Sequence, residues 1–202
     1  SSVQALNFDD VPLGDNAETP IASPYHGFNF IQAGIHNPPG SGPFTTYAPH
    51  SGSNLAFIGE KNGVEQDGYA GTAGDPISIV QTDGSRFTAL GAWFSSNGSE
   101  PMTITVSGYV DGILVSSFSQ EIHQGGAGGP TYVDLSVLGS VDKITLDAPN
   151  YFGFDDFSYT DNSTASGNVI TGAGTTNSGA DLLGADGAKI TGVVGVTADT
   201  TS

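Results

Sequence analysis

The sequence predicts an all-β domain, an antiparallel β-sandwich of jelly-roll type with long loops. From residue 1 to about residue 161, short apolar segments alternate with clusters of Gly, Pro, Asn and Asp, and no stretch keeps a helical period. The clearest strand is Met102–Tyr109, in which apolar and hydroxyl-bearing residues alternate. Asp111 and Gly112 then predict a tight turn into a second strand, Ile113–Phe118. Repetition of this pattern favours two packed sheets.

Seven further segments are short, apolar and bounded by turn residues. These predicted strands are Leu6–Phe8, Leu55–Ile58, Ile77–Val80, Phe87–Phe94, Tyr132–Leu135, Lys143–Leu146 and Phe154–Tyr159. Trp93 lies in the fourth of them and is expected in the core or half-buried at a sheet surface. The stretch Val11–Ser53 is rich in Pro, Gly and His, and we expect a long loop there. Because ordered loops of this length are usually functional, we also expect a site in it.

The charge balance is strongly acidic. Lys and Arg total 4 against 21 Asp and Glu, which gives a net charge of −17. Such a surface repels a phosphate backbone, so nucleic acid is excluded as a partner. Most carboxylates have no cationic side chain to pair with, and we expect divalent cations, Ca²⁺ above all, to neutralise part of them. The alternative is a solvated acidic surface, as in proteins of salty environments.

Cysteine is absent, so no disulfide stabilises the chain, and hard cations such as Ca²⁺ would suit an extracellular domain. No apolar run is long enough to insert into a membrane, and no signal-peptide pattern begins at Ser1. From Asp161 onward Ser, Thr, Gly and Ala dominate and no aromatic residue occurs. We therefore predict a sandwich over residues 1–161 and, over residues 162–202, a linker and the start of an adjoining domain.

Two acidic pairs frame the predicted sandwich. Asp9 and Asp10 lie near its start, and Asp155 and Asp156 lie near its end, each pair next to Phe. If the first and last strands are neighbours, the two pairs meet at one sheet edge. Adjacent residues of a strand point to opposite faces, so one Asp of each pair is expected to cap the edge while the other binds Ca²⁺. The alternative is that these carboxylates only accept hydrogen bonds from turns.

A second set of oxygen donors lies in the middle of the chain. Glu60, Glu65 and Asp67 are expected to be further Ca²⁺ ligands, and Asn54, a short distance before them, is expected to contact the ligand. The spacing of an EF-hand is absent. The alternative is that these residues form an acidic hairpin tip that is open to solvent.

Five ring-bearing residues are predicted to lie in loops rather than in strands. Tyr25, His26, Tyr47, His50 and Tyr69 are therefore candidates for ligand contact, because surface-binding modules use exposed rings and a few fixed polar groups. Packing against the end of the sandwich is the alternative for each of them.

Catalytic motifs are weak in this sequence. Its 4 histidines show neither a His-Glu-x-x-His pattern nor close pairing, and neither a Gly-x-Ser-x-Gly elbow nor a phosphate loop occurs. A glycosidase would need two facing carboxylates, a pair that 21 acids can supply by chance. We expect a binding protein rather than an enzyme.

Two parts of the chain resemble known families. The segments Gly167–Gly174 and Gly179–Ala188 resemble the start of the Ig-like repeats of long RTX adhesins exported by type I secretion. The sandwich, with its opening Phe-Asp-Asp, the Gly-Phe-Asn-Phe of residues 27–30 and its closing Phe-Asp-Asp-Phe, resembles secreted jelly-roll modules. Together these features resemble the Ca²⁺-dependent peptide-binding and carbohydrate-binding domains of RTX adhesins.

The resemblance implies a secreted module at a bacterial cell surface that takes part in adhesion and biofilm formation. A partly exposed Ca²⁺ would be completed by oxygens of the ligand. A peptide's terminal carboxylate is our first expectation, because a carboxylate gains more from a cation on a negative surface than a hydroxyl does and the loops lack Trp. A glycan's vicinal hydroxyls are the alternative, and a structural spacer of the adhesin is the third.

Overall fold

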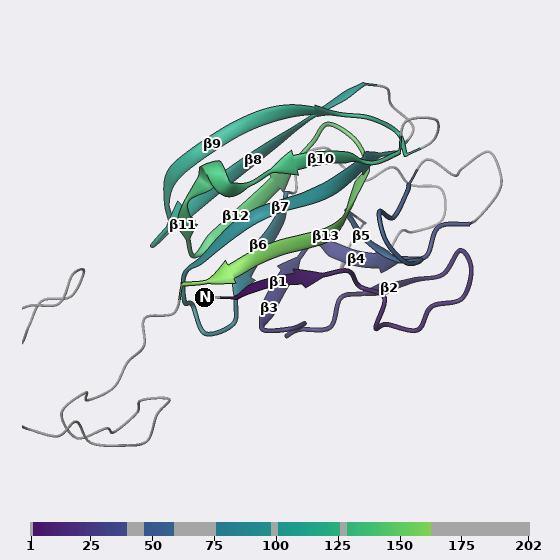
Figure 1. The fold of residues 1–202 in the computed structure, drawn as a ribbon, viewed down its shortest axis with the longest axis horizontal. Helices are drawn as coiled ribbons and strands as arrows, with labels where there is room; N and C mark the ends of the chain where they lie inside the picture. Colours follow the sequence, from purple (N-terminus) through teal and green to yellow (C-terminus); the bar gives the residue numbers. More distant parts are fainter. Residues whose placement is uncertain (1, 40–46, 59–75, 98–100, 126–128, 163–202) are drawn as a thin grey trace, which may run out of the picture. The chain divides into compact units, whose positions relative to one another are not determined.

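The computed structural model describes residues 2–39, 47–58, 76–97, 101–125 and 129–162. They form two antiparallel sheets that pack as a sandwich, so the predicted fold class is confirmed (Figure 1). No helix within these residues is long and apolar enough to cross a membrane. The chain divides into two compact units, Ser1–Ser163 and Thr164–Ser202, and the second unit lies outside the described residues.

The larger sheet has eight strands in the order β10-β7-β13-β5-β4-β2, with β1 beside β13 and β11 beside β7. Its strands are β1 (Val3–Leu6), β2 (Glu18–Pro20), β4 (Ala33–His36), β5 (Leu55–Ile58), β7 (Phe87–Ser96), β10 (Thr131–Asp134), β11 (Ser140–Val141) and β13 (Phe152–Asp161). The long strand β13 changes neighbour midway, because its first half pairs with β5 and its second half with β1. β7 lies along its other side throughout.

The smaller sheet has five strands in the order β3-β6-β12-β8-β9. Its strands are β3 (Phe28–Ile31), β6 (Ile77–Gln81), β12 (Lys143–Asp147), β8 (Met102–Val110) and β9 (Ile113–Ile122). A short 3-10 helix, η1 (Ser136–Leu138), connects β10 to β11. The hairpin predicted between β8 and β9 is present, and Asp111 and Gly112 both take positive φ in its turn.

The core between the sheets is rich in Phe. Phe8, which is fully buried, stacks on Tyr25 with ring centroids 5.5 Å apart and meets the edge of Phe154 at 5.8 Å. In β8 and β12 buried apolar residues alternate with more exposed, mostly polar ones, as expected for sheets with one wet face, and in β6 Ile77 and Ile79 are buried. Burial of an aromatic side chain of this size stabilises the fold by roughly 1.5–3 kcal/mol relative to exposure.

The prediction of one long loop over Val11–Ser53 is wrong, because β2, β3 and β4 lie within it. β2 has only three residues, and β4 is buried at all four positions, so it shows no alternation. The first predicted strand, Leu6–Phe8, is also misplaced. β1 ends at Leu6, and Phe8 has a left-handed φ of 62° that turns the chain out of the sheet.

Candidate functional site

Three segments meet where β13 changes neighbour. The chain leaves β1 through residues 7–11, residues 50–54 lead into β5, and β13 has an irregularity after Asp155. The two acidic pairs occupy this junction, and both of them contact the segment 50–54. β1 and β13 are neighbours, as the sequence analysis supposed. However, β13 runs inside the sheet, so Asp155 and Asp156 do not lie at a sheet edge.

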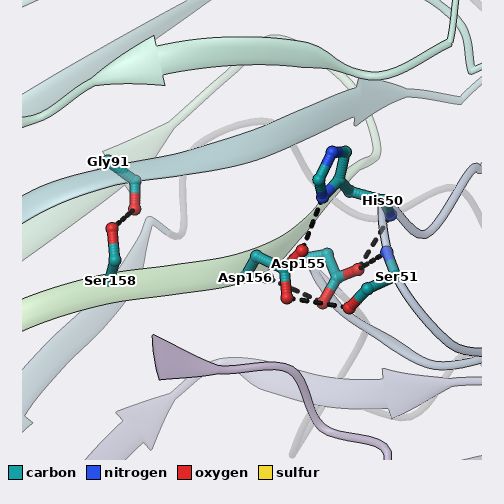
Figure 2. Close-up of polar contacts among 6 residues, drawn as sticks. All are labelled: His50, Ser51, Gly91, Asp155, Asp156 and Ser158. Atoms are coloured by element: carbon teal, nitrogen blue, oxygen red, sulfur yellow. Dashed lines mark hydrogen bonds and ion pairs between the residues drawn. The ribbon is translucent and has the colours of Figure 1, made fainter. Parts of the chain in front are cut away.

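Both carboxylates of the second pair face the same loop (Figure 2). Asp155 Oδ2 accepts hydrogen bonds from the backbone N–H groups of His50 at 2.8 Å and Ser51 at 2.9 Å. Asp156 Oδ1 accepts the hydroxyl of Ser51 at 2.8 Å, and its Oδ2 lies 2.6 Å from His50 Nδ1. The expectation of opposite faces is wrong here, because Asp156 has a φ of 50° at a β-bulge that re-aims its side chain.

Burial sets the protonation of Asp155. The residue is 1% exposed, and its pKa is raised to about 7, mainly because the carboxylate is removed from water and partly because Asp156 carries a negative charge. The N–H groups of Ser51, Asp156 and His50 act in the opposite direction but do not outweigh burial. Near neutral pH this carboxyl group therefore exchanges a proton while remaining hydrogen-bonded to the loop.

Asp9 and Asp10 of the first pair contact different parts of the chain. Asp9 Oδ1 accepts the N–H groups of Ser53 at 2.8 Å and Asn54 at 3.0 Å. A Cβ on Gly52, which has a φ of 55°, would lie 1.8 Å from Asp9 Oδ2, so only glycine fits against this carboxylate. Asn54 is buried, and its Nδ2 donates to the carbonyl oxygens of Phe8 and Val11. The structure thus uses Asn54, a predicted ligand contact, to hold the turn after β1.

Asp10 points away from that loop, toward the turn before β3. Its Oδ1 accepts the hydroxyl of Tyr25 at 2.6 Å, and its Oδ2 lies 2.6 Å from His26 Nε2. The hydrogen bond from Tyr25 is the main reason that the pKa of Asp10 is lowered. Tyr25 is buried and its ring packs on Phe8, whereas the side chain of His26 is half exposed. Of these two predicted ligand contacts, only His26 presents its side chain to solvent.

His50 belongs to an aromatic group on the outer face of the larger sheet. Its imidazole lies parallel to Trp93 with centroids 3.9 Å apart and 4° between the planes. Tyr132 stands opposite Trp93 on β10, with centroids 5.3 Å apart, and is 47% exposed. Trp93 is half-buried at the sheet surface, one of its two predicted positions. We call His50, Trp93 and Tyr132 the aromatic platform.

The remaining predicted ligand contacts lie elsewhere. Tyr47 is 7% exposed and packs with Phe57 and the ring of His36 beside a groove of about 510 Å³ lined partly by Pro38 and Pro49. Four predicted residues lie outside the described part of the chain: Glu60, Glu65, Asp67 and Tyr69.

The acidic pairs make hydrogen bonds to other described residues. Among the described residues no group of three or more His, Cys, Asp or Glu side chains is placed to hold a metal ion. Asp9, Asp155 and Asp156 instead accept hydrogen bonds from the segment 50–54, and Asp10 accepts one from Tyr25. Hydrogen bonding of this kind is the alternative role that the sequence analysis gave for the acidic pairs. Ca²⁺ binding stays a prediction for all the residues expected to hold it, namely Asp9, Asp10, Asp155, Asp156, Glu60, Glu65 and Asp67.

Excess Ca²⁺ is expected to raise the melting midpoint above that in EDTA. Binding to the folded state alone adds about 2.7 kcal/mol when free Ca²⁺ is a hundredfold above its Kd. The combined variant Glu60→Gln, Glu65→Gln and Asp67→Asn should remove the difference, and Mg²⁺ in place of Ca²⁺ tests its ion selectivity. Equal midpoints of the unaltered chain in EDTA and in Ca²⁺ would show that no ion contributes to its stability.

No family model matches the sequence, and no curated protein does. The solved structures that match include the following three. A DUF4465 family protein from Bacteroides ovatus is 10% identical, with a TM-score of 0.46 over 78% of this chain and 94% of that chain. The CBM22 and GH10 modules of a Clostridium thermocellum endo-1,4-beta-D-xylanase, complexed with xylohexaose, are 13% identical, with a TM-score of 0.39 over 72% of this chain and 28% of that chain. The Stig cyclase Fisc from Fischerella sp. TAU is 10% identical, with a TM-score of 0.42 over 80% of this chain and 100% of that chain. At these values no ligand or residue role transfers to this chain.

Proposed function

We propose that the chain is a non-catalytic carbohydrate-binding module of a secreted bacterial surface protein and that the aromatic platform receives the glycan. One observation carries the proposal: a parallel imidazole and indole stand beside a tyrosine that is 47% exposed, on the outer face of a rigid sheet. Flat rings held in fixed positions offer the apolar faces of a sugar ring a surface to stack on, at little cost in side-chain entropy.

Polar groups beside the aromatic platform suit a ligand rich in hydroxyls. Ser51 and Asp156 adjoin the imidazole, and the carboxylate of Asp156 is 22% exposed. Carboxylate oxygens accept hydrogen bonds from hydroxyls with the added strength of a charged acceptor. The hydrogen bond between His50 Nδ1 and Asp156 keeps the imidazole parallel to Trp93, so the surface is organised before a ligand arrives.

The charge of the site favours a glycan over a peptide C-terminus. A terminal carboxylate would approach Asp156 on a chain with a net charge of −17, and it would need a Ca²⁺ ion to offset that repulsion. Among the described residues, no group of three or more His, Cys, Asp or Glu side chains is placed to hold such an ion. Capture of a peptide C-terminus through a Ca²⁺ held by Glu60, Glu65 and Asp67 is the second candidate, and the RTX-like tail supports a surface-protein setting for either.

Substitution of the aromatic platform tests the proposal. Affinity electrophoresis against neutral bacterial, fungal and plant polysaccharides should reveal at least one ligand, and Tyr132→Ala or His50→Ala should weaken its binding about tenfold, as expected for a central aromatic contact. Tyr109→Ala is the matched control, because Tyr109 lies on β8 of the other sheet and packs against Lys143. Equal losses in all three variants, or retention of full affinity by both platform variants, would exclude the aromatic platform as the site.

The same assay separates the alternatives. Binding that EDTA abolishes, together with binding of free-acid but not amidated peptides, would identify the peptide-binding function instead. Failure to bind any glycan or peptide in Ca²⁺ would leave the structural spacer. Release of reducing sugar from a bound polysaccharide would contradict the non-catalytic part of the proposal.

A further inference from the structure

A second cavity, of about 250 Å³, lies at the other half of β13 and shares no residue with the aromatic platform. Its walls come from β1, β6 and β13 and from the turns at residues 26–27 and 82–85. Every lining residue belongs to the described part of the chain. We propose that this cavity binds an organic cation that carries N–H donors, namely an alkylammonium or guanidinium group, through the carboxylate of Asp161.

The carboxylate of Asp161 is held between two amides. Gln4 Nε2 donates to its Oδ2 at 3.1 Å, and Gln81 Nε2 donates to its Oδ1. Each amide is fixed in turn by a hydroxyl, because Tyr159 donates to Gln4 Oε1 at 3.0 Å and Ser85 donates to Gln81 Oε1. Both amide NH₂ groups are thereby oriented toward Asp161, and the two oxygens of the carboxylate cannot easily turn away.

This arrangement leaves both oxygens of the Asp161 carboxylate able to accept a further hydrogen bond. An ionised carboxylate has about four lone-pair sites, and the two glutamines use one on each oxygen. A ligand with two N–H donors can therefore meet both oxygens at once, which is the geometry of a charge-assisted fork. Burial and the charge of Asp161 raise the pKa of Tyr159, so its phenol stays a donor to Gln4.

The negative charge of the cavity favours a positively charged ligand. Asp83 and Asp161 line it, and no Lys or Arg does. Arg86 follows the turn in sequence, but its guanidinium lies 3.7 Å from Asp111 instead. His26 also lines the cavity, and its Nε2 lies 2.6 Å from the carboxylate of Asp10. A neutral ligand would leave the charge of Asp161 without a counter-charge in the cavity, whereas a cation neutralises it.

Four small probes separate charge from hydrogen bonding. In EDTA and at low salt, n-butylammonium and methylguanidinium should shift the amide NMR signals of residues 81–85 and 159–161 in a saturable way. Tetramethylammonium carries the charge without N–H donors, and urea carries N–H donors without the charge. Each should bind at least about tenfold more weakly, the usual effect of losing a charge-assisted hydrogen bond.

Variants locate the binding. Asp161→Asn should weaken methylguanidinium binding about tenfold or more, and Asp83→Asn should weaken it by a smaller factor. The matched control is Asp147→Asn, an exposed carboxylate on β12 that makes the same change in net charge outside the cavity. Thermal melts of all three variants check that they fold. If Asp161→Asn does not fold, Asp83→Asn together with the probe series still decides the proposal.

Three results would overturn the proposal. Equal binding of tetramethylammonium and methylguanidinium would reduce the effect to non-specific attraction by an acidic chain. Tighter binding of glucose than of either cation would make the cavity a polyol site. An absence of saturable shifts would mean that it holds no small cation. The glycan proposal is independent of these outcomes, because the cavity shares no residue with the aromatic platform.

Discussion

Asn54→Ala is expected to lower the free energy of unfolding by roughly 2–4 kcal/mol. The Asn54 residue is 3% exposed, and its Nδ2 donates to the carbonyl oxygens of Phe8 at 2.9 Å and Val11 at 2.8 Å. Alanine would leave both carbonyl groups without this donor at a point where Phe8 has a φ of 62°. A left-handed residue persists only where its surroundings hold it, so the turn after β1 should loosen together with the Asp9 contacts.

Ser53→Ala is the control for this prediction. Ser53 is exposed and contacts Asp9 through its backbone N–H, which the substitution keeps. Its free energy of unfolding should stay within about 0.5 kcal/mol of the unaltered chain in urea denaturation. If Asn54→Ala were as stable as Ser53→Ala, the buried amide would not hold the turn, and a direct role of Asn54 in ligand contact would return as its explanation.

Strands with a strong local pattern could be predicted from the sequence, and those without one could not. The bounds of β5, Leu55–Ile58, agree with the prediction, and β6 and β12 differ by one residue at their ends. β4 is different, because every residue of Ala33–His36 is buried and its partners are distant in sequence. Such a strand is positioned by its pairing with β2 and β5 rather than by a pattern in its own residues.

The sequence indicated single residues of the site but not how they are arranged. His50, Asp155 and Asp156 stood out in the sequence, but their contacts depend on a β-bulge with a positive φ at Asp156, which no local pattern indicates. Tyr132 was not singled out, although the alternation of exposed Tyr132 and Asp134 with buried Val133 is visible in β10. Its position opposite Trp93 depends on the register between β10 and β7, which is a long-range property.

The stability of the folded chain is expected to change with pH through Asp155. Burial raises the pKa of this carboxyl from an ordinary value of 3.8 to about 7 in the folded state. Between these two values the folded chain binds a proton that the unfolded chain has lost. The unfolded state therefore binds fewer protons, and the free energy of unfolding falls as the pH rises from about 4 to 7. The expected loss is on the order of 3 kcal/mol.

Asp155→Asn isolates this contribution. An amide keeps one oxygen for the N–H groups of His50 and Ser51 but carries no charge to desolvate, so the decline between pH 4 and 7 should become shallower. Self-repulsion of the acidic chain also grows over this range, and Asp147→Asn measures that background because it removes one exposed carboxylate elsewhere. Urea titrations at half-unit intervals of pH give both slopes. Parallel curves for the two variants would mean that Asp155 is ionised throughout, and its hydrogen bonds to the segment 50–54 would then outweigh its burial.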